Sequence, residues 1–167
     1  MKIILDANII LGYYKETVLE IEHSLTDSPS KLFTKEITVL IDTGGKIEHE
    51  YTALLDKDWV KNWIIDLIDQ NILLTIETEN HQPVCAALYK LGFPNSSRDI
   101  WYIRTGCTAS KSFKTEVYLI TEDLDFYNPK SKQCPPNIRQ STLSCFNSPI
   151  QKLLEKQDLL VRSVCSC

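Results

Sequence analysis

The chain has 167 residues, with 18 lysines and arginines against 22 aspartates and glutamates, which gives a formal net charge of -4. This length fits one domain around one hydrophobic core, and the negative balance excludes a protein whose whole surface attracts nucleic acid. Because the sequence begins directly with a strand pattern and has neither an export signal nor an apolar run of about 18 residues, we expect a cytoplasmic protein without a membrane span.

The first third of the chain predicts a strand, a helix and a second strand. Residues 3–5 are consecutive apolar residues, typical of a short strand buried on both faces, and Asp6 follows at the carboxyl end of that strand. Residues 9–25 have the apolar spacing of an amphipathic helix, for which Asn8 is the expected N-cap. Residues 37–41 predict the next strand, and a glycine-containing turn follows it.

The middle of the chain predicts mainly helices. Residues 47–55 and 58–68 form two apolar stripes at helical spacing, the second rich in tryptophan that we interpret as core. Residues 72–76 indicate either a short strand or an extended link. A helix is expected over 83–91, opened by a proline, and another from Arg98 through Cys107.

The last third predicts a strand over 117–120, irregular structure over 127–148 and a final helix over 150–161. Alternating strands and helices predict a mostly parallel sheet covered by helices on both faces, a three-layer α/β/α sandwich. We expect a single domain over 1–167, in which 127–167 is a less regular C-terminal extension ending in a helix. Right-handed crossovers place the carboxyl ends of all strands along one edge, so Asp6 and Asp123 are expected to be neighbours.

Six cysteines do not indicate a disulfide framework, because the chain is large, has an apolar core pattern and lacks an export signal. We therefore expect reduced thiols. A structural zinc site is the weaker alternative, since no pair has the C-x-x-C spacing of common zinc sites. Its candidate ligands are the four cysteines after residue 130, Cys134, Cys145, Cys165 and Cys167.

Acidic residues recur at the expected edge of the sheet. Asp6 and Asp123 follow strand ends, Asp99 lies near a helix start, and Glu48 and Glu50 follow a glycine pair. Carboxylates gathered in a partly buried site repel one another by several kcal/mol, which a divalent cation relieves. All-oxygen ligation favours Mg²⁺ or Mn²⁺, and such a site activates water for attack on a phosphodiester.

These residues resemble the PIN domain nucleases, which include the ribonuclease toxins of bacterial toxin-antitoxin pairs. The resemblance covers about residues 1–126 and depends on the order and spacing of short motifs. The motifs are Leu5-Asp6-Ala7-Asn8-Ile9-Ile10, the segment from Gly44-Gly45 to Glu50-Tyr51, Arg98-Asp99-Ile100, and Ile120-Thr121-Glu122-Asp123-Leu124-Asp125-Phe126.

The resemblance implies a metal-dependent endoribonuclease that cleaves single-stranded RNA, with single-stranded DNA as the alternative substrate. It implies an antitoxin or a defence-operon protein as a partner, and a homodimer is a further expectation. The implied metal ligands and catalytic acids are Asp6, Glu50, Asp99 and Asp123, with Asp125 either behind them or on a second metal, and Asn8 and Thr121 orienting the acids.

Several assignments keep alternatives. Asp6 could simply cap the following helix, but Asn8 can do that, so a functional role is favoured. Glu48 competes with Glu50 as the second acid, and Asp99 could serve only the helix dipole. At the late strand end, Glu122 and Asp125 compete with Asp123. The alternative function is a catalytically inactive PIN-like module that binds RNA or a protein, although the presence of all the acids argues against it.

Overall fold

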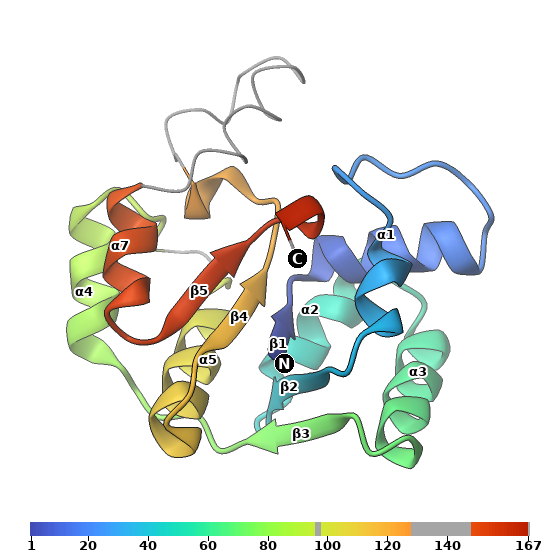
Figure 1. Cartoon of the computed structure of the whole chain (residues 1–167), viewed down its shortest axis with the longest axis horizontal. Helices are drawn as coiled ribbons and strands as arrows, with labels where there is room; N and C mark the ends of the chain where they lie inside the picture. The colour runs from blue at the N-terminus through green and yellow to red at the C-terminus, as the bar shows by residue number, and fades with distance from the viewer. Residues whose placement is uncertain (96–97, 128–147, 167) are drawn as a thin grey trace.

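A five-stranded parallel sheet forms the centre of the protein, with helices on both faces, as a three-layer α/β/α sandwich (Figure 1). The computed structural model describes residues 1–95, 98–127 and 148–166. The strand order is β3-β2-β1-β4-β5, so the first strand of the chain is the central one. The strands are β1 (Lys2–Leu5), β2 (Thr38–Asp42), β3 (Leu73–Ile76), β4 (Val117–Ile120) and β5 (Leu159–Arg162).

The α-helices connect these strands, and short 3-10 turns flank them. The helices are α1 (Ala7–Thr17), α2 (Lys46–Leu54), α3 (Lys57–Asp69), α4 (Gln82–Lys90), α5 (Ile100–Phe113) and α7 (Pro149–Glu155). The 3-10 turns are η1 (Pro29–Thr34), η2 (Leu124–Phe126) and η4 (Val164–Ser166). Helix α5 lies across the sheet and contacts every strand. A Cβ at Gly106 would collide with the side chain of Leu159, so a glycine there permits this close packing.

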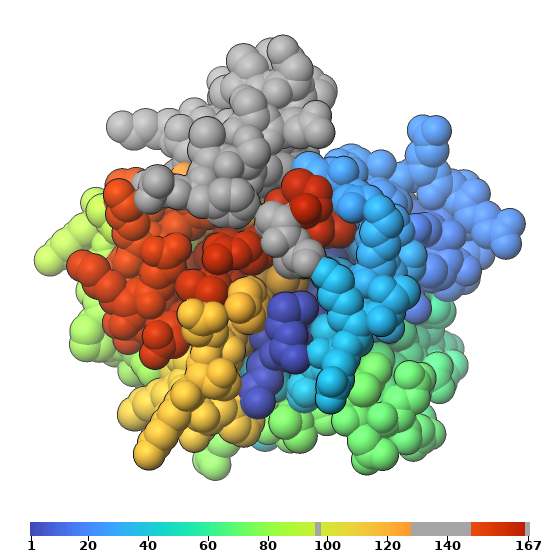
Figure 2. Space-filling view, viewed as in Figure 1, coloured from blue at the N-terminus to red at the C-terminus, as the bar shows by residue number. Residues whose placement is uncertain are grey.

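The core is centred on β1, as the sequence predicts. Ile3, Ile4 and Leu5 have no exposed surface, because β2 and β4 pair with β1 on its two sides and helices cover both faces. In the space-filling view, the amino end of β1 lies between the segment that leads into β2 and the segment of β4 (Figure 2). The predicted fold class is confirmed.

The predicted first helix is wrong over its second half. Helix α1 ends at Thr17, and Glu20 then adopts a positive φ of 53°, which a helix cannot continue. Val18 and Ile21, which extended the apolar stripe in the sequence, are about half exposed, at 47% and 51%. Their spacing in the sequence matched an amphipathic helix, but in the structure these side chains do not pack into the hydrophobic core.

The predicted last helix is also wrong beyond Glu155. Asp158 turns the chain with a φ of 53°, and residues 159–162 then form β5, which pairs with β4 as the fifth strand. Leu159 and Val161 are buried while Leu160 and Arg162 are partly exposed. This alternation with period two is the strand signal that the helical interpretation overlooked. The extension therefore contributes a fifth strand to the sheet after α7.

Other predictions need smaller changes. The segment 72–76, which could have been a link, contains β3. The helix predicted from Arg98 begins at Ile100 and continues through Phe113. Most of the region predicted to be irregular, residues 127–148, lies outside the described residues. No helix in the described ranges combines the length and the apolar character that crossing a bilayer requires.

The described cysteines are free thiols. Cys85 and Cys107 are buried and Cys165 is exposed. Burial, together with the neighbouring Cys85, raises the pKa of Cys107 to about 12, so this thiol is an inert core residue. Three candidate zinc ligands, Cys134, Cys145 and Cys167, lie outside the described residues.

Candidate metal centre

The carboxyl ends of β1 and β4 bring together residues that are far apart in the chain. Leu5 pairs with Ile120, and the amide of Asp6 donates to the carbonyl of Ile120 at 3.0 Å. Asp6 and Thr121, the residues that follow these paired positions, therefore lie side by side. The hydroxyl of Thr121 donates to Asp6 Oδ2 at 2.5 Å. The same hydroxyl accepts a hydrogen bond from the amide of Asp123 at 3.0 Å. Thr121 thus links the two strand ends that carry acids.

Asp6 is the N-cap of α1, whereas the sequence predicted Asn8 in this role. Asp6 Oδ1 accepts a hydrogen bond from the amide of Asn8 at 3.3 Å, while Asn8 itself lies in the first turn with an exposed side chain. The expectation that Asn8 caps this helix is therefore wrong. Asp6 can cap α1 and also lie beside the other acids, because Oδ1 accepts from the amide of Asn8 and Oδ2 accepts from the hydroxyl of Thr121.

The carboxyl group of Asp6 is almost completely buried, with 3% of the residue exposed. Burial is the main cause that raises its pKa from 3.8 to about 7, and the negative charges of Asp99 and Asp123 raise it further. The hydrogen bonds from Thr121 and Asn8 oppose this shift. A positive charge placed among these acids would lower the free energy of the ionised form.

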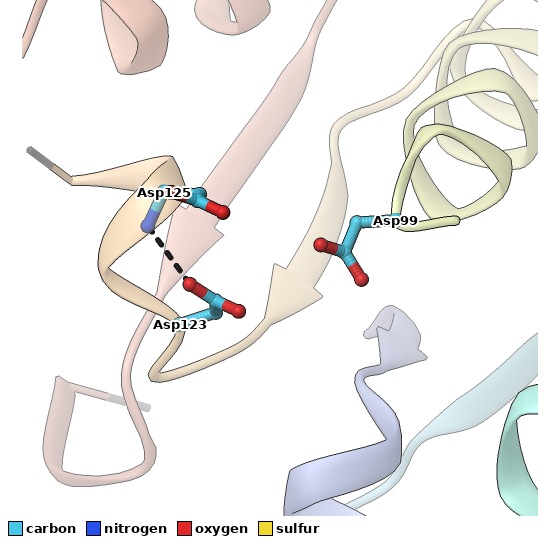
Figure 3. A group of neighbouring side chains, drawn as sticks. All are labelled: Asp99, Asp123 and Asp125. Atoms are coloured by element: carbon cyan, nitrogen blue, oxygen red, sulfur yellow. Dashed lines mark hydrogen bonds between the residues drawn. The ribbon is translucent and has the colours of Figure 1, made fainter. Parts of the chain in front are cut away.

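Three more carboxylates gather beside this strand end. Asp99, Asp123 and Asp125 each offer an oxygen, and these oxygens lie within 4.8 Å of one another (Figure 3). Asp99 precedes the first turn of α5, whereas Asp123 and Asp125 belong to the turn after β4. The amide of Asp125 donates to Asp123 Oδ1 at 2.9 Å, which orients that carboxylate. We call these three residues the acid cluster.

The acid cluster fits a hard divalent cation. Oxygens that bind one Mg²⁺ at about 2.1 Å lie about 3.0 Å apart when adjacent and about 4.2 Å apart when opposite, so three oxygens within 4.8 Å of one another would need to draw closer around one ion. The cluster contains neither a histidine nor a cysteine, which disfavours zinc and copper. Asp125 is buried, and the other two acids are partly exposed, so one side of the cluster is open to solvent.

Glu50 is placed differently from the other predicted ligands. Its carboxylate forms an ion pair with Arg98 at 3.4 Å and is not among the described acids that could share one ion. Since Arg98 directly precedes Asp99, Glu50 lies near the acid cluster but its charge is directed to the guanidinium. Glu48 is exposed in the first turn of α2. Of the two glutamates, Glu50 is the one that contacts a residue next to the acid cluster, through its ion pair with Arg98.

Two buried tyrosines and one aspartate support the site and were missed in the sequence. The hydroxyl of Tyr51 donates to the carbonyl of Leu5 at 2.7 Å, and the hydroxyl of Tyr102 accepts from the amide of Ala7 at 3.2 Å. These bonds fix the backbone on both sides of Asp6. Asp42 caps α2 by accepting from the amides of Lys46 and Ile47, at 2.9 and 2.8 Å. Both tyrosines fall within predicted helices, but nothing in the sequence indicated their burial or their backbone partners.

No family model, curated protein or solved structure matches this chain.

Proposed function

We propose that this protein is a Mg²⁺- or Mn²⁺-dependent nuclease that hydrolyses phosphodiester bonds, with single-stranded RNA as the substrate and single-stranded DNA as the alternative. The observation that carries the proposal is the acid cluster, whose carboxylate oxygens lie within 4.8 Å of one another beside the buried carboxyl of Asp6. Carboxylates from separate segments of the chain repel one another at this distance, and a shared cation would relieve that repulsion.

The residues have distinct roles in this proposal. A bound Mg²⁺ or Mn²⁺ would neutralise a phosphate oxygen of the substrate and lower the pKa of an attacking water. Asp99, Asp123 and Asp125 would hold the ion, and Asp6 would contribute negative charge beside it. Thr121 orients both strand ends through its hydroxyl, and Tyr51 and Tyr102 keep the backbone around Asp6 fixed.

The choice of RNA depends on the resemblance to PIN domain nucleases. The same resemblance supports a protein inhibitor or another defence-operon protein as a partner and supports a homodimer, which we propose on that ground alone. In this protein, Glu50 would act on the site through Arg98, because its carboxylate forms an ion pair with the guanidinium of Arg98.

A catalytically inactive module that binds RNA or a protein is the second candidate. The observation in its favour is the ion pair between Glu50 and Arg98, which leaves the acid cluster without the second acid that the resemblance implies. The two candidates differ in one property. Only the nuclease requires a divalent cation for its effect on RNA.

The test uses the purified full chain with structured RNA, unstructured RNA and single-stranded DNA, in Mg²⁺, in Mn²⁺ and in EDTA. We expect cleavage of unstructured RNA that needs the metal and stops with EDTA. Asp99→Asn and Asp123→Asn should each lower the rate by at least about 100-fold. Asp66→Asn, on the exposed face of α3, is the matched control and should cleave like the unmodified protein. Cleavage that ignores chelation would refute the proposal, and binding of RNA without cleavage would favour the inactive module.

A further inference from the structure

A polar pocket of about 360 Å³ lies between α1 and the segment 18–28, next to the acid cluster. Its volume falls within the range of about 300 to 1,000 Å³ that small-ligand sites occupy. Asp123 and Asn8 line the pocket, and Asp123 is also a member of the acid cluster, so the two sites are contiguous. We call it the α1 pocket. Its lining includes Asn8, Lys15, His23, Leu25, Glu122 and Asp123.

The outer wall of the α1 pocket is fixed by buried contacts. The amide of Thr26 donates to both carboxylate oxygens of Glu122, at 3.1 and 3.0 Å, and the hydroxyl of Thr26 donates to the same carboxylate. The amide of Val164 donates to Glu122 as well, at 3.3 Å, and Glu122 is only 1% exposed. Leu25 packs so closely on α1 that a Cβ at Gly12 would collide with it. The segment 18–28 therefore presents a preformed surface to the pocket.

His23 is held in one orientation within this wall. Its Nδ1 accepts a hydrogen bond from the amide of Leu25 at 3.3 Å, and its Nε2 lies 4.0 Å from a carboxylate oxygen of Glu16. An aromatic ring held through its Nδ1, with its Nε2 beside a carboxylate, loses little conformational freedom when a flat group stacks on it. Histidine is one of the side chains on which unpaired bases stack in single-stranded nucleic acids.

Lys15 supplies the positive charge of the pocket. It lies in the last turn of α1 and is partly buried, and it forms no ion pair with any residue in the described parts of the chain. The acids that line the pocket are Asp123, which belongs to the acid cluster, and Glu122, whose oxygens accept backbone hydrogen bonds. Glu16 lies outside this lining and accepts hydrogen bonds from Ser28 and Ser30. An ammonium in this position is available to a phosphate of the substrate.

We propose that the α1 pocket binds the nucleotide next to the cleaved phosphodiester bond of a single-stranded nucleic acid, an inference that depends on the proposed nuclease function. The base stacks on His23 against Leu25, and the phosphate of that nucleotide contacts Lys15. Because Asp123 separates this pocket from the acid cluster, the next phosphate along the strand reaches the cluster. The protein therefore has a local phosphate-binding group although its net charge is negative.

The test measures binding and cleavage separately. Binding of a fluorescein-labelled unstructured RNA is followed by anisotropy, in the Asp99→Asn background with Ca²⁺, over a series of salt concentrations. Lys15→Ala and Lys15→Gln should weaken binding about 3- to 10-fold and lower the slope of log K against log salt by about 0.7, the loss of one phosphate contact to a single strand. His23→Ala should weaken binding about 5- to 100-fold, the range for one stacked base, with little change in the salt slope.

In the otherwise unmodified chain, the same substitutions should raise KM more than they lower kcat and should leave Mn²⁺ binding unchanged. Lys61→Ala, an exposed lysine of α3, is the control and should have no effect. If metal-dependent cleavage is present but the Lys15 and His23 variants bind RNA like the parent, the pocket inference fails while the nuclease proposal stands. If the unmodified protein neither binds nor cleaves nucleic acid, both fail. Lys15→Gln retains part of the aliphatic stem of the lysine. A variant that binds RNA more weakly but melts at the same temperature as the parent is folded, so unfolding does not explain its weaker binding.

Discussion

Replacing Asp6 by asparagine should stabilise the metal-free protein while it removes a charge from the site. The carboxyl of Asp6 is buried, and its pKa is raised from 3.8 to about 7. Each pH unit between these two values corresponds to about 1.4 kcal/mol, so ionised Asp6 costs the folded state about 4 kcal/mol above pH 7. An uncharged asparagine avoids this cost. It also loses part of the hydrogen bonding from Thr121 and Asn8, which we set at about 1 kcal/mol.

The sign of the pH dependence follows from the raised pKa. Between about pH 4 and pH 7 the folded protein keeps a proton on Asp6 that the unfolded chain releases. The free energy of unfolding therefore falls as the pH rises through this window, and the loss is complete above about pH 7. Asp6→Asn should gain about 3 kcal/mol at pH 8 and less than about 1 kcal/mol at pH 5.

Thermal unfolding in EDTA at pH 5 and pH 8 measures this difference. For a chain of this size, about 3 kcal/mol corresponds to a rise in Tm of about 6 to 12 °C at pH 8, with a much smaller rise at pH 5. Asp66→Asn is the control for a surface aspartate and should change stability by less than about 0.5 kcal/mol. An equal effect of Asp6→Asn at both pH values, or a lower Tm at pH 8, would refute the electrostatic account.

Three further predictions concern the supports of the site. Tyr51→Phe leaves the buried carbonyl of Leu5 without its side-chain donor and should cost about 1 to 3 kcal/mol in urea unfolding; an unchanged midpoint would exclude that role. Glu50→Gln should lower kcat by less than about 10-fold, because Glu50 contacts Arg98 and lies outside the acid cluster. A loss of kcat as large as that of Asp99→Asn would instead make Glu50 a metal ligand. Gly106→Ala should destabilise the fold by about 1 to 3 kcal/mol, since the added methyl meets Leu159; a neutral result in the same assay would mean that α5 and β5 can move apart.

The sequence could predict the sheet because its strands have short, strongly apolar runs. Residues 3–5 and 117–120 are apolar throughout, and both are strands with the expected neighbours. The sequence could not predict where the ends of α1 and α7 fall, because Val18, Ile21 and Leu160 continue a helical spacing by coincidence. The backbone there is decided by residues with positive φ and by contacts to distant segments.

The acids at the strand ends could be predicted because parallel strands with right-handed crossovers deliver their carboxyl ends to one edge. This rule predicted that Asp6 and Asp123 lie in the same region, and Asp99, at the start of α5, lies beside them. The pairing of Glu50 with Arg98 could not be predicted, because the direction of a long side chain at a helix surface depends on its neighbours in space. The α1 pocket was missed for the same reason, since its wall depends on Glu122.

The binding of Mn²⁺ to the full chain tests the central claim most directly. A titration at pH 8, followed by the loss of the electron paramagnetic resonance signal of free Mn²⁺, should show Mn²⁺ bound by the unmodified protein. Asp99→Asn and Asp123→Asn should each weaken this binding at least about 10-fold, while Asp66→Asn should bind like the parent. Mn²⁺ affinity that is the same in all four proteins would contradict the account, because the acid cluster would then not be the place where a cation binds.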